Sequence, residues 1–236
     1  RRQTSVALQC SAPECVISNI NIMKKLIFAV LSFLAVVSCS RNVGPIRIDV
    51  PERPAGQESV LGLATDPIDT VRVGFIGLGM RGYSAVDRFT FVPDSKITAL
   101  CDIESDRVTR SSEILQRKGL PAAEMYGGEA DSWKKVCESE NVDLVYICTD
   151  WKTHTPMALY AMECGKHVAI EVPAATTLEE IWALINMSEK TRKHCMMLEN
   201  CIYDFFEMNT LAMAQAGAFG EIVHVEGAYH HCLDPY

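Results

Sequence analysis

Several patterns are missing from this 236-residue sequence, and their absence argues against particular classes of protein. There is no cluster of Lys and Arg and the formal net charge is -8, so no nucleic-acid partner is expected, because phosphate binding needs a basic face. The 10 cysteines form no C-x-x-C pair, which favours buried free thiols over a zinc or disulfide framework. No H-x-x-E-H set, internal repeat or low-complexity tract occurs. The remaining composition, 48% hydrophobic, is that of a globular protein. Without a basic face for nucleic acid, a small-molecule ligand is expected.

The stretch that begins at Met23, MKKLIFAVLSFLAVVSCS, is typical of an export signal. Two lysines are followed by an apolar run that is too short to span a bilayer comfortably. Its end resembles a bacterial lipobox, in which cleavage before Cys39 leaves a thiol for lipidation. We therefore expect a lipid-anchored protein exported to the periplasm or the cell surface. The expected segments are a gene-model extension at 1–22, a lipoprotein signal peptide at 23–39 and a linker at 40–70.

From Val71 onward, short apolar runs alternate with helical patterns, as they do in a doubly wound parallel sheet. We predict an α/β Rossmann domain over 71–200. Its expected strands are 71–79, 96–102, 142–150, 167–173 and 194–200; its expected helices are 83–89, 105–118, 131–138, 154–165 and one that Thr177 opens with a capping box. Beyond it, 201–236 predict a helix and then a strand, EIVHVEGAYHH. Because a lone strand has two unpaired edges, we interpret this stretch as the start of a truncated C-terminal α/β domain with an open sheet.

Gly77-Leu78-Gly79-Met80-Arg81-Gly82 fits the pattern G-x-G-x-x-G. The motif follows a predicted strand and opens a helix, and Asp102 stands 20 residues after Gly82, at the end of the second strand. Gly77 permits the tight turn, Gly79 lets a pyrophosphate approach the backbone, and Gly82 lets the helix pack on the strand. Asp102 can accept hydrogen bonds from ribose hydroxyls and would repel a 2′-phosphate. The sequence therefore predicts NAD as the cofactor, and the alternative is a plain glycine turn with a helix-capping aspartate.

Three consecutive strands end in polar residues. Asp150, Trp151 and His154 follow one strand, Glu171 ends the next, and Asn200 ends the third. Because ligands bind outside the carboxyl ends of the strands in open α/β sheets, these side chains are expected to converge on one rim. Each of them alone could equally be a cap, a core residue or an exposed residue.

At these residues the chain resembles the Gfo/Idh/MocA superfamily, in which a Rossmann domain precedes a C-terminal α/β domain with an open sheet. Most dehydrogenases of that group carry Glu-Lys-Pro, with a catalytic lysine, where this chain has Glu171-Val172-Pro173. With TDWKTHTPMALYAMECGKHVAIEVPAA and YDFFEMNTLAMAQAGAFGEIVHVEGAYHH, the chain is similar to glycoside hydrolase family 109, typified by NAD-dependent α-N-acetylgalactosaminidases. The resemblance covers Val71 to Tyr236.

The resemblance implies a set of site residues. His231 would be the catalytic acid/base, and Tyr229 would contact both the substrate and the reactive end of the cofactor. Period two on a strand puts these two side chains on one face, although an ordinary sheet surface would do the same. The implied NAD contacts outside the glycines are Met80, Arg81, Asp102, Trp151, Lys152, Thr153, His154, Glu171, Val172, Asn200 and Tyr229, and no metal ligand is expected.

The resemblance also implies a glycosidase cycle that does not use the usual pair of carboxylates. It consists of hydride abstraction from C3 of the sugar, loss of the C2 proton with elimination at C1, addition of water, and return of the hydride. An exported sugar oxidoreductase of the same superfamily is the alternative, and a lipid-anchored carbohydrate-binding protein with a vestigial nucleotide fold is a third. The expected partners are a small-molecule or glycan substrate and, through the anchor, a membrane; homo-oligomer formation stays open. The chain by itself is expected to be inactive.

Overall fold

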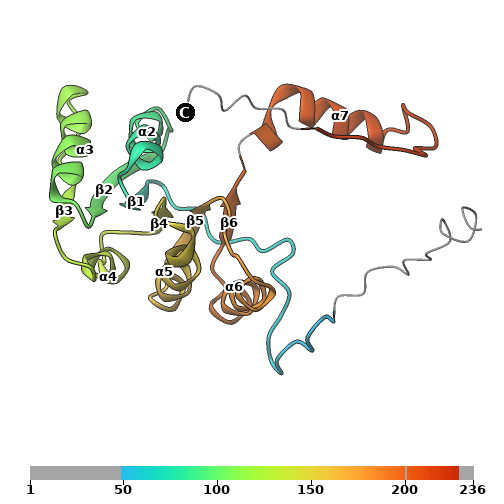
Figure 1. Cartoon of the computed structure of the whole chain (residues 1–236), viewed down its shortest axis with the longest axis horizontal. Helices are drawn as coiled ribbons and strands as arrows, with labels where there is room; N and C mark the ends of the chain where they lie inside the picture. Colours follow the sequence, from blue (N-terminus) through green and yellow to red (C-terminus); the bar gives the residue numbers. More distant parts are fainter. Residues whose placement is uncertain (1–48, 200, 229–236) are drawn as a thin grey trace, which may run out of the picture. The chain divides into compact units, whose positions relative to one another are not determined.

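A six-stranded parallel sheet organises the computed structural model, which describes residues 49–199 and 201–228 (Figure 1). The strand order is β3-β2-β1-β4-β5-β6, and every neighbouring pair is parallel. The strands are β1 (Val71–Ile76), β2 (Ser95–Asp102), β3 (Glu124–Gly127), β4 (Leu144–Ile147), β5 (His167–Glu171) and β6 (Cys195–Leu198). The helices are α2 (Met80–Phe89), α3 (Ser105–Arg117), α4 (Ser132–Glu138), α5 (Trp151–Glu163), α6 (Leu178–Thr191), η1 (Cys201–Tyr203) and α7 (Phe205–Gln215). The predicted doubly wound Rossmann fold is confirmed.

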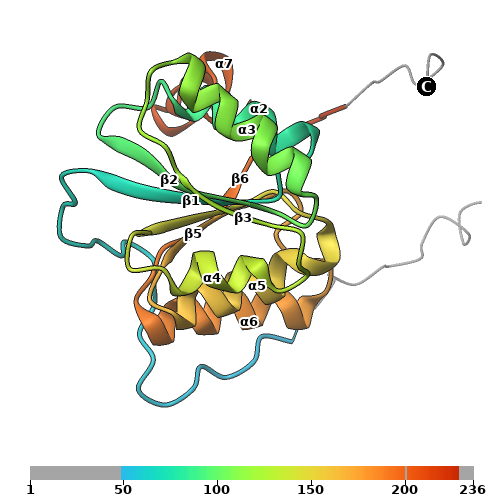
Figure 2. The same ribbon diagram turned by 90° about the vertical axis from the view of Figure 1, so that its left-hand side faces the viewer.

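Two apolar clusters lie on opposite faces of the sheet, because side chains alternate along each strand. Val73 and Phe75 of β1 belong to the cluster that α2 and α3 cover, whereas Ile76 belongs to the cluster covered by α4, α5 and α6. Figure 2 shows the same division, with α2 and α3 on one side of the strands and α4, α5 and α6 on the other. Because all six strands are parallel, their carboxyl ends lie along one edge of the sheet. Within the described ranges, no helix is long and apolar enough to cross a membrane.

The helix that follows β5 begins at the predicted capping box. Thr177 Oγ1 accepts a hydrogen bond from the Glu180 N–H at 3.2 Å, and the Glu180 carboxylate accepts one from the Thr177 N–H at 3.3 Å. These bonds satisfy donors that have no partner inside the helix. The start of α6, and with it the length of the loop after Glu171, is thus fixed by local chemistry.

One predicted strand is wrong over its described part, and one observed strand was not predicted. Residues 221–228, the described part of EIVHVEGAYHH, form no strand, because no second strand in the described part lies beside them to pair with their backbone groups. The strand β3 was not predicted; it is a four-residue edge strand that, within the described sheet, pairs only with β2. Such a short strand carries too few residues for period-two alternation to show.

The described part of the predicted linker is fastened to α6. Arg53 Nε donates to both carboxylate oxygens of Glu189, at 3.0 and 3.2 Å, and Arg192 donates to the backbone oxygen of Glu58 at 2.8 Å. Glu189 is a buried carboxylate, so its charge requires this partner. Residues 53–59 therefore bind α6 before the chain reaches β1. The predicted signal peptide and Cys39 lie outside the described residues.

His167, the first residue of β5, is expected to make folding stability sensitive to mild acid. Its Nδ1 accepts a hydrogen bond from the His194 N–H at 3.0 Å, and burial, followed by Lys193, lowers its pKa below 6.5. Below pH 6.5 the unfolded chain binds a proton that the folded chain resists, so the free energy of unfolding should fall as pH falls toward the lowered pKa.

The measurement is urea unfolding at several pH values between this lowered pKa and neutrality. His167→Asn keeps an acceptor for the His194 N–H but does not titrate, so its stability should change less with pH than that of the parent chain. His224→Asn, at an exposed histidine, is the matched control and should leave the pH dependence unchanged. Equal slopes for the parent and His167→Asn would contradict the prediction.

Candidate functional site

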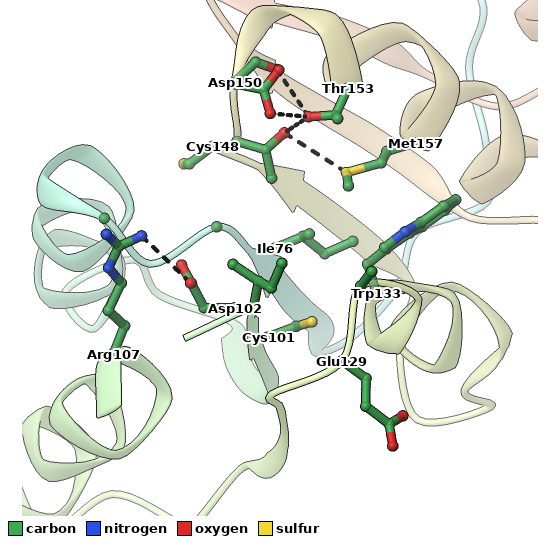
Figure 3. Close-up of a pocket in the computed structure, with 15 residues that line it drawn as sticks. Ile76, Cys101, Asp102, Arg107, Glu129, Trp133, Cys148, Asp150, Thr153 and Met157 are labelled. Atoms are coloured by element: carbon green, nitrogen blue, oxygen red, sulfur yellow. Dashed lines mark hydrogen bonds and ion pairs between the residues drawn. The ribbon is translucent and has the colours of Figure 1, made fainter. Parts of the chain in front are cut away.

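A cavity of about 450 Å³ opens at the carboxyl ends of β1, β2 and β4 (Figure 3). This is where the strand order reverses, with β2 on one side of β1 and β4 on the other, and where doubly wound sheets bind dinucleotides. It is lined by Ile76, Gly77, Gly79, Cys101, Asp102, Ile103, Arg107, Glu129, Ala130, Trp133, Cys148, Thr149, Asp150, Thr153 and Met157. Of the predicted site residues, the cavity brings together Gly77, Gly79, Asp102 and Thr153.

The glycine turn has the backbone shape that its sequence requires. Gly77 has φ +90, and a Cβ there would stand 2.6 Å from the Cys148 carbonyl oxygen, so a side chain is excluded on both grounds. A Cβ on Gly82 would stand 1.9 Å from the Gly77 carbonyl oxygen. Gly79 has open space where its Cβ would be and lines the cavity. The turn is therefore close-packed against the strands and bare toward the cavity, as a pyrophosphate cradle must be.

Asp102 ends β2 with a buried carboxylate, 5% exposed. Oδ2 accepts a hydrogen bond from the Leu78 N–H at 2.6 Å, and Oδ1 accepts one from the Glu104 N–H at 2.9 Å. Arg107 Nη1 lies 3.5 Å from Oδ1, and Figure 3 shows its guanidinium facing the carboxylate. Since a carboxylate has about four acceptor sites and these three donors use three of them, one site remains for a ribose hydroxyl. The carboxylate is thus held in place by the glycine turn and still able to bind a sugar.

The opposite wall of the cavity is formed by the start of α5. Asp150 caps this helix by accepting a hydrogen bond from the Lys152 N–H at 2.9 Å, and Thr153 Oγ1 donates to Thr149 Oγ1 at 2.8 Å. Figure 3 shows the Thr153 hydroxyl directed at Asp150, whose Oδ2 lies 3.2 Å from it. Burial raises the pKa of the Cys148 thiol, just before this helix, to about 12, so the thiol is neutral, and it does the same for Cys101 of β2 across the cavity. The wall is therefore polar but uncharged except at Asp150.

His154 does not line this cavity. Its ring is fully buried, with Nδ1 2.8 Å from the Pro173 carbonyl oxygen and Nε2 3.1 Å from the Thr149 carbonyl oxygen. The side chain thus ties the first turn of α5 to the loop after β5. The sequence placed it at the correct rim, but the structure gives its ring a role in holding that rim together.

The other predicted residues on this rim are divided between an ion pair and the surface. Arg81 Nε donates to Glu171 Oε1 at 2.8 Å, across the end of β4. Met80 is 91% exposed and Trp151 63% exposed, with Lys152 and Val172 also exposed. None of these six residues lines the cavity, so the structure separates this cavity from the rim around Glu171. Asn200, Tyr229 and His231 lie outside the described residues.

Several residues that line the cavity escaped the sequence analysis. Arg107 could have been found, because it stands in the first turn of the helix directly after Asp102, where a cationic side chain faces the strand ends. Trp133 and Glu129 follow the missed strand β3, so no local pattern placed them at the site. Thr149 and Met157 also line the cavity, but neither is charged or part of a motif, so the sequence gives no signal for them.

The described residues fit NAD. The bare glycine turn suits a pyrophosphate, and the carboxylate of Asp102 suits an unmodified ribose. The family model described as an oxidoreductase family with an NAD-binding Rossmann fold, Gfo/Idh/MocA, matches residues 71–199. NAD is therefore the cofactor of this domain, as the sequence predicted.

Among solved structures, the chain is similar to a putative myo-inositol dehydrogenase from Sinorhizobium meliloti, with a TM-score of 0.55 and 22% identity over 64% of this chain and 43% of the other. It is also similar to a WlbA dehydrogenase from Chromobacterium violaceum in complex with NADH and UDP-GlcNAcA, with a TM-score of 0.55 and 19% identity over 67% and 44% of the two chains. At these identities the likeness shows the fold alone.

Curated relatives are more similar in sequence. Glycosyl hydrolase family 109 protein 1 from Bacteroides fragilis is 60% identical over 208 residues, which is 86% of this chain and 45% of the relative. The protein of the same name from Bacteroides thetaiotaomicron is 55% identical over 222 residues, 91% of this chain and 48% of the relative. The chain thus spans about half the length of these relatives. It belongs to the Gfo/Idh/MocA family of NAD-binding oxidoreductases, and the curated relatives to which it is similar are glycosyl hydrolase family 109 proteins.

Proposed function

We propose that this chain is the cofactor-binding part of an exported NAD-dependent glycosidase that acts on α-N-acetylgalactosaminide-type glycans. The observation that carries the proposal is the combination of an NAD cavity with 55–60% identity to glycosyl hydrolase family 109 proteins. Because the chain spans about half of those relatives, the substrate and the activity are proposed for the protein as a whole.

The end of β5 supports a glycosidase over an ordinary dehydrogenase. Val172 follows Glu171 at the rim and has no group that can carry or donate a proton. The cation beside Glu171 is instead Arg81, a guanidinium that stays protonated in proteins. A lysine that protonates or deprotonates a sugar hydroxyl is therefore absent from the position where most dehydrogenases of this family have one.

When bound, NAD supplies reversible hydride transfer to and from C3 of the sugar. With C3 at the ketone level, the C2 proton becomes acidic, and His231 would remove it while the bond from C1 to the leaving oxygen breaks. Water then adds a hydroxyl at C1 and a proton at C2, and reduction at C3 restores the sugar. Tyr229, which the family resemblance places at the substrate, would contact the sugar at this end of the site.

Export and a nucleotide cofactor are compatible only under a redox-neutral cycle. A net dehydrogenase outside the cytoplasm would have no nicotinamide pool to reoxidise its cofactor, whereas the proposed cycle leaves one retained NAD unchanged after each turnover. The predicted lipoprotein signal at 23–39 therefore favours a cycle that restores NAD, such as that of the proposed glycosidase, over a net dehydrogenase. The alternative, an exported sugar oxidoreductase, would need a second substrate as its hydride acceptor.

The test joins this chain to the part of the Bacteroides fragilis relative that it does not span, alongside the chain alone. In heavy water with no external hydride acceptor, the joined protein is expected to release sugar from an aryl α-N-acetylgalactosaminide, to incorporate deuterium at C2 and to accumulate no NADH. His231→Ala should lower the rate by about 10²- to 10⁴-fold, the usual contribution of a general acid or base. NADH formed in step with product would favour the oxidoreductase, and full activity of His231→Ala would remove that residue from the mechanism.

A further inference from the structure

The segment that precedes β1 is fastened along α6, and we call its residues 53–60 the strap. Arg53 Nε donates to both carboxylate oxygens of Glu189, at 3.0 and 3.2 Å, and the Glu189 side chain is 3% exposed. Gln57 Nε2 donates to the Asn186 side-chain oxygen at 3.3 Å and to Glu189 at 3.4 Å. Because a buried carboxylate requires such donors, the strap and α6 are held together as one unit.

A strained arginine holds the end of the strap that is nearer to β1. Arg192 follows the last residue of α6 with φ +54 and ψ +40, the left-handed conformation in which glycine is the usual residue. Its guanidinium donates to the backbone oxygens of Glu58 and Ser59 at 2.8 and 3.2 Å. A glycine would relieve the backbone but could not make these bonds. The side chain at this position therefore serves to hold the strap.

An apolar groove of about 370 Å³ lies between the strap and the loop after β5. Val60 of the strap lines the groove together with residues 173–175 of that loop. The rest of the wall comes from α6 and β6, with Leu184 and Met197 among its side chains. The strap thus bounds on one side the groove that the loop bounds on another.

The same loop is held from its other side by α5. His154 Nδ1 lies 2.8 Å from the Pro173 carbonyl oxygen, and Thr155 Oγ1 donates to the Ala174 carbonyl oxygen at 3.1 Å. Both bonds fall just after Glu171, the last residue of β5. The loop therefore lies between fixed hydrogen bonds to α5 and an apolar groove that depends on the strap.

This loop lies on the half of the sheet where the second half of a dinucleotide binds. The glycine turn after β1 and Asp102 at the end of β2 line the cavity, so the adenosine half belongs to the side of the sheet that carries β2. A dinucleotide crosses from one half of a doubly wound sheet to the other. Its nicotinamide half would therefore extend over the ends of β4 and β5, toward the loop that begins at Val172.

We propose that the strap is a positioning element for the cofactor site. By closing the groove, it holds residues 172–175 in the conformation that accepts the nicotinamide half of NAD. The strap acts through this loop and does not itself contact the cofactor, since no strap residue lines the NAD cavity. The inference rests on NAD as the cofactor and is independent of the glycosidase chemistry.

The test measures the binding of NAD, ADP-ribose and AMP to the full chain by titration calorimetry, together with hydrogen exchange of the amides in 172–176. Arg192→Gly loosens the strap but relieves the backbone of α6, so the melting temperature should stay within about 4 °C of the parent chain. NAD should bind about three- to tenfold more weakly, which is the contribution of one hydrogen bond, and the loop amides should exchange faster. ADP-ribose and AMP should stay within about twofold. Val60→Ala, which removes the strap side chain from the groove, should give the same ligand profile.

Asp94→Gly is the matched control, because Asp94 is the other non-glycine residue with positive φ in the described part of the chain, at +52, and lies just before β2, at the amino edge of the sheet. It should leave all three affinities and the exchange of the loop unchanged. The proposal is overturned if Arg192→Gly weakens ADP-ribose and AMP as much as NAD, which would show a general structural role. It is equally overturned if the affinity for NAD or the exchange of the loop does not change.

Discussion

Gly82→Ala is expected to abolish detectable NAD binding and to lower the melting temperature of the chain. The added Cβ would stand 1.9 Å from the Gly77 carbonyl oxygen and 3.3 Å from Cys148 Cβ. The turn cannot move aside, because the Gly77 N–H is bonded to the Cys101 carbonyl oxygen at 2.8 Å and the Leu78 N–H to Asp102. The start of α2 must therefore shift away from the strands, which costs about 1–3 kcal/mol or more.

The loss of binding follows from the shift of α2, because its N–H groups no longer point at the pyrophosphate. A displacement of about 1 Å at such a site can cost about 100-fold in function, and we expect at least this loss in NAD affinity. The measurements are calorimetric titration with NAD and thermal unfolding followed by circular dichroism. Normal NAD affinity in Gly82→Ala would contradict the geometry of the turn.

Gly79→Ala separates the two effects. Its φ of -63 suits any residue, and no atom lies within 4 Å of the added Cβ, so the melting temperature should not change. The methyl group would stand on the bare side of the turn, so NAD binding should still be weakened. A glycine needed for packing and a glycine needed for the ligand are thereby distinguished within one motif.

Asp102→Ser is expected to reverse the cofactor preference of the domain. NAD should bind about 10- to 100-fold more weakly, because hydrogen bonds from the ribose to a charged acceptor are lost. NADP should bind about tenfold more tightly than it binds the parent chain, because the carboxylate no longer repels the 2′-phosphate and Arg107, 3.5 Å from Oδ1, is freed to pair with it. Competition between NAD and NADP in equilibrium titration measures both changes.

The role of Arg107 is tested by the double variant Asp102→Ser with Arg107→Ala. The gain for NADP should disappear, while the loss for NAD should remain. A gain that persists without Arg107 would show that removal of the negative charge is sufficient by itself. Arg107→Ala in the parent background should leave the preference for NAD in place, because Asp102 is still present to bind the ribose.

The parts of the site that could be predicted are those encoded within one turn and one helix. Gly77 and Gly82 are required by local backbone geometry, Gly79 by the room that a pyrophosphate needs, and Asp102 by its place at the end of β2, so spacing alone identified them. The capping box of α6 was equally local. The doubly wound order followed from alternating strands and helices, because parallel neighbours require a crossover between them.

What escaped prediction depends on contacts between distant residues. Arg81 and Glu171 are 90 positions apart, and nothing in either neighbourhood shows that they pair. The imidazole of His154 can be buried because the carbonyl oxygen of Pro173, 19 residues away, accepts a hydrogen bond from its Nδ1. Apolar and polar residues alternate along 221–228 as they do in a strand. This alternation indicates which side chains would share a face, but a strand also needs a neighbouring strand to bind its backbone groups.

The strand order β3-β2-β1-β4-β5-β6 also determines when the nucleotide site exists during synthesis. A chain made from its N-terminus can pair β1 with β2 early, because only residues 77–94 separate them. The other edge of β1 stays unpaired until β4 has emerged, and residues 77–143 separate β1 from β4. Asp102 ends β2 and Thr153 lies in α5, after β4, so the two residues can line one cavity only after β1 has paired with β4. NAD can therefore stabilise the finished domain but cannot assist the first strand pair. Until β4 is made, the pair of β1 and β2 is stabilised by its apolar packing alone.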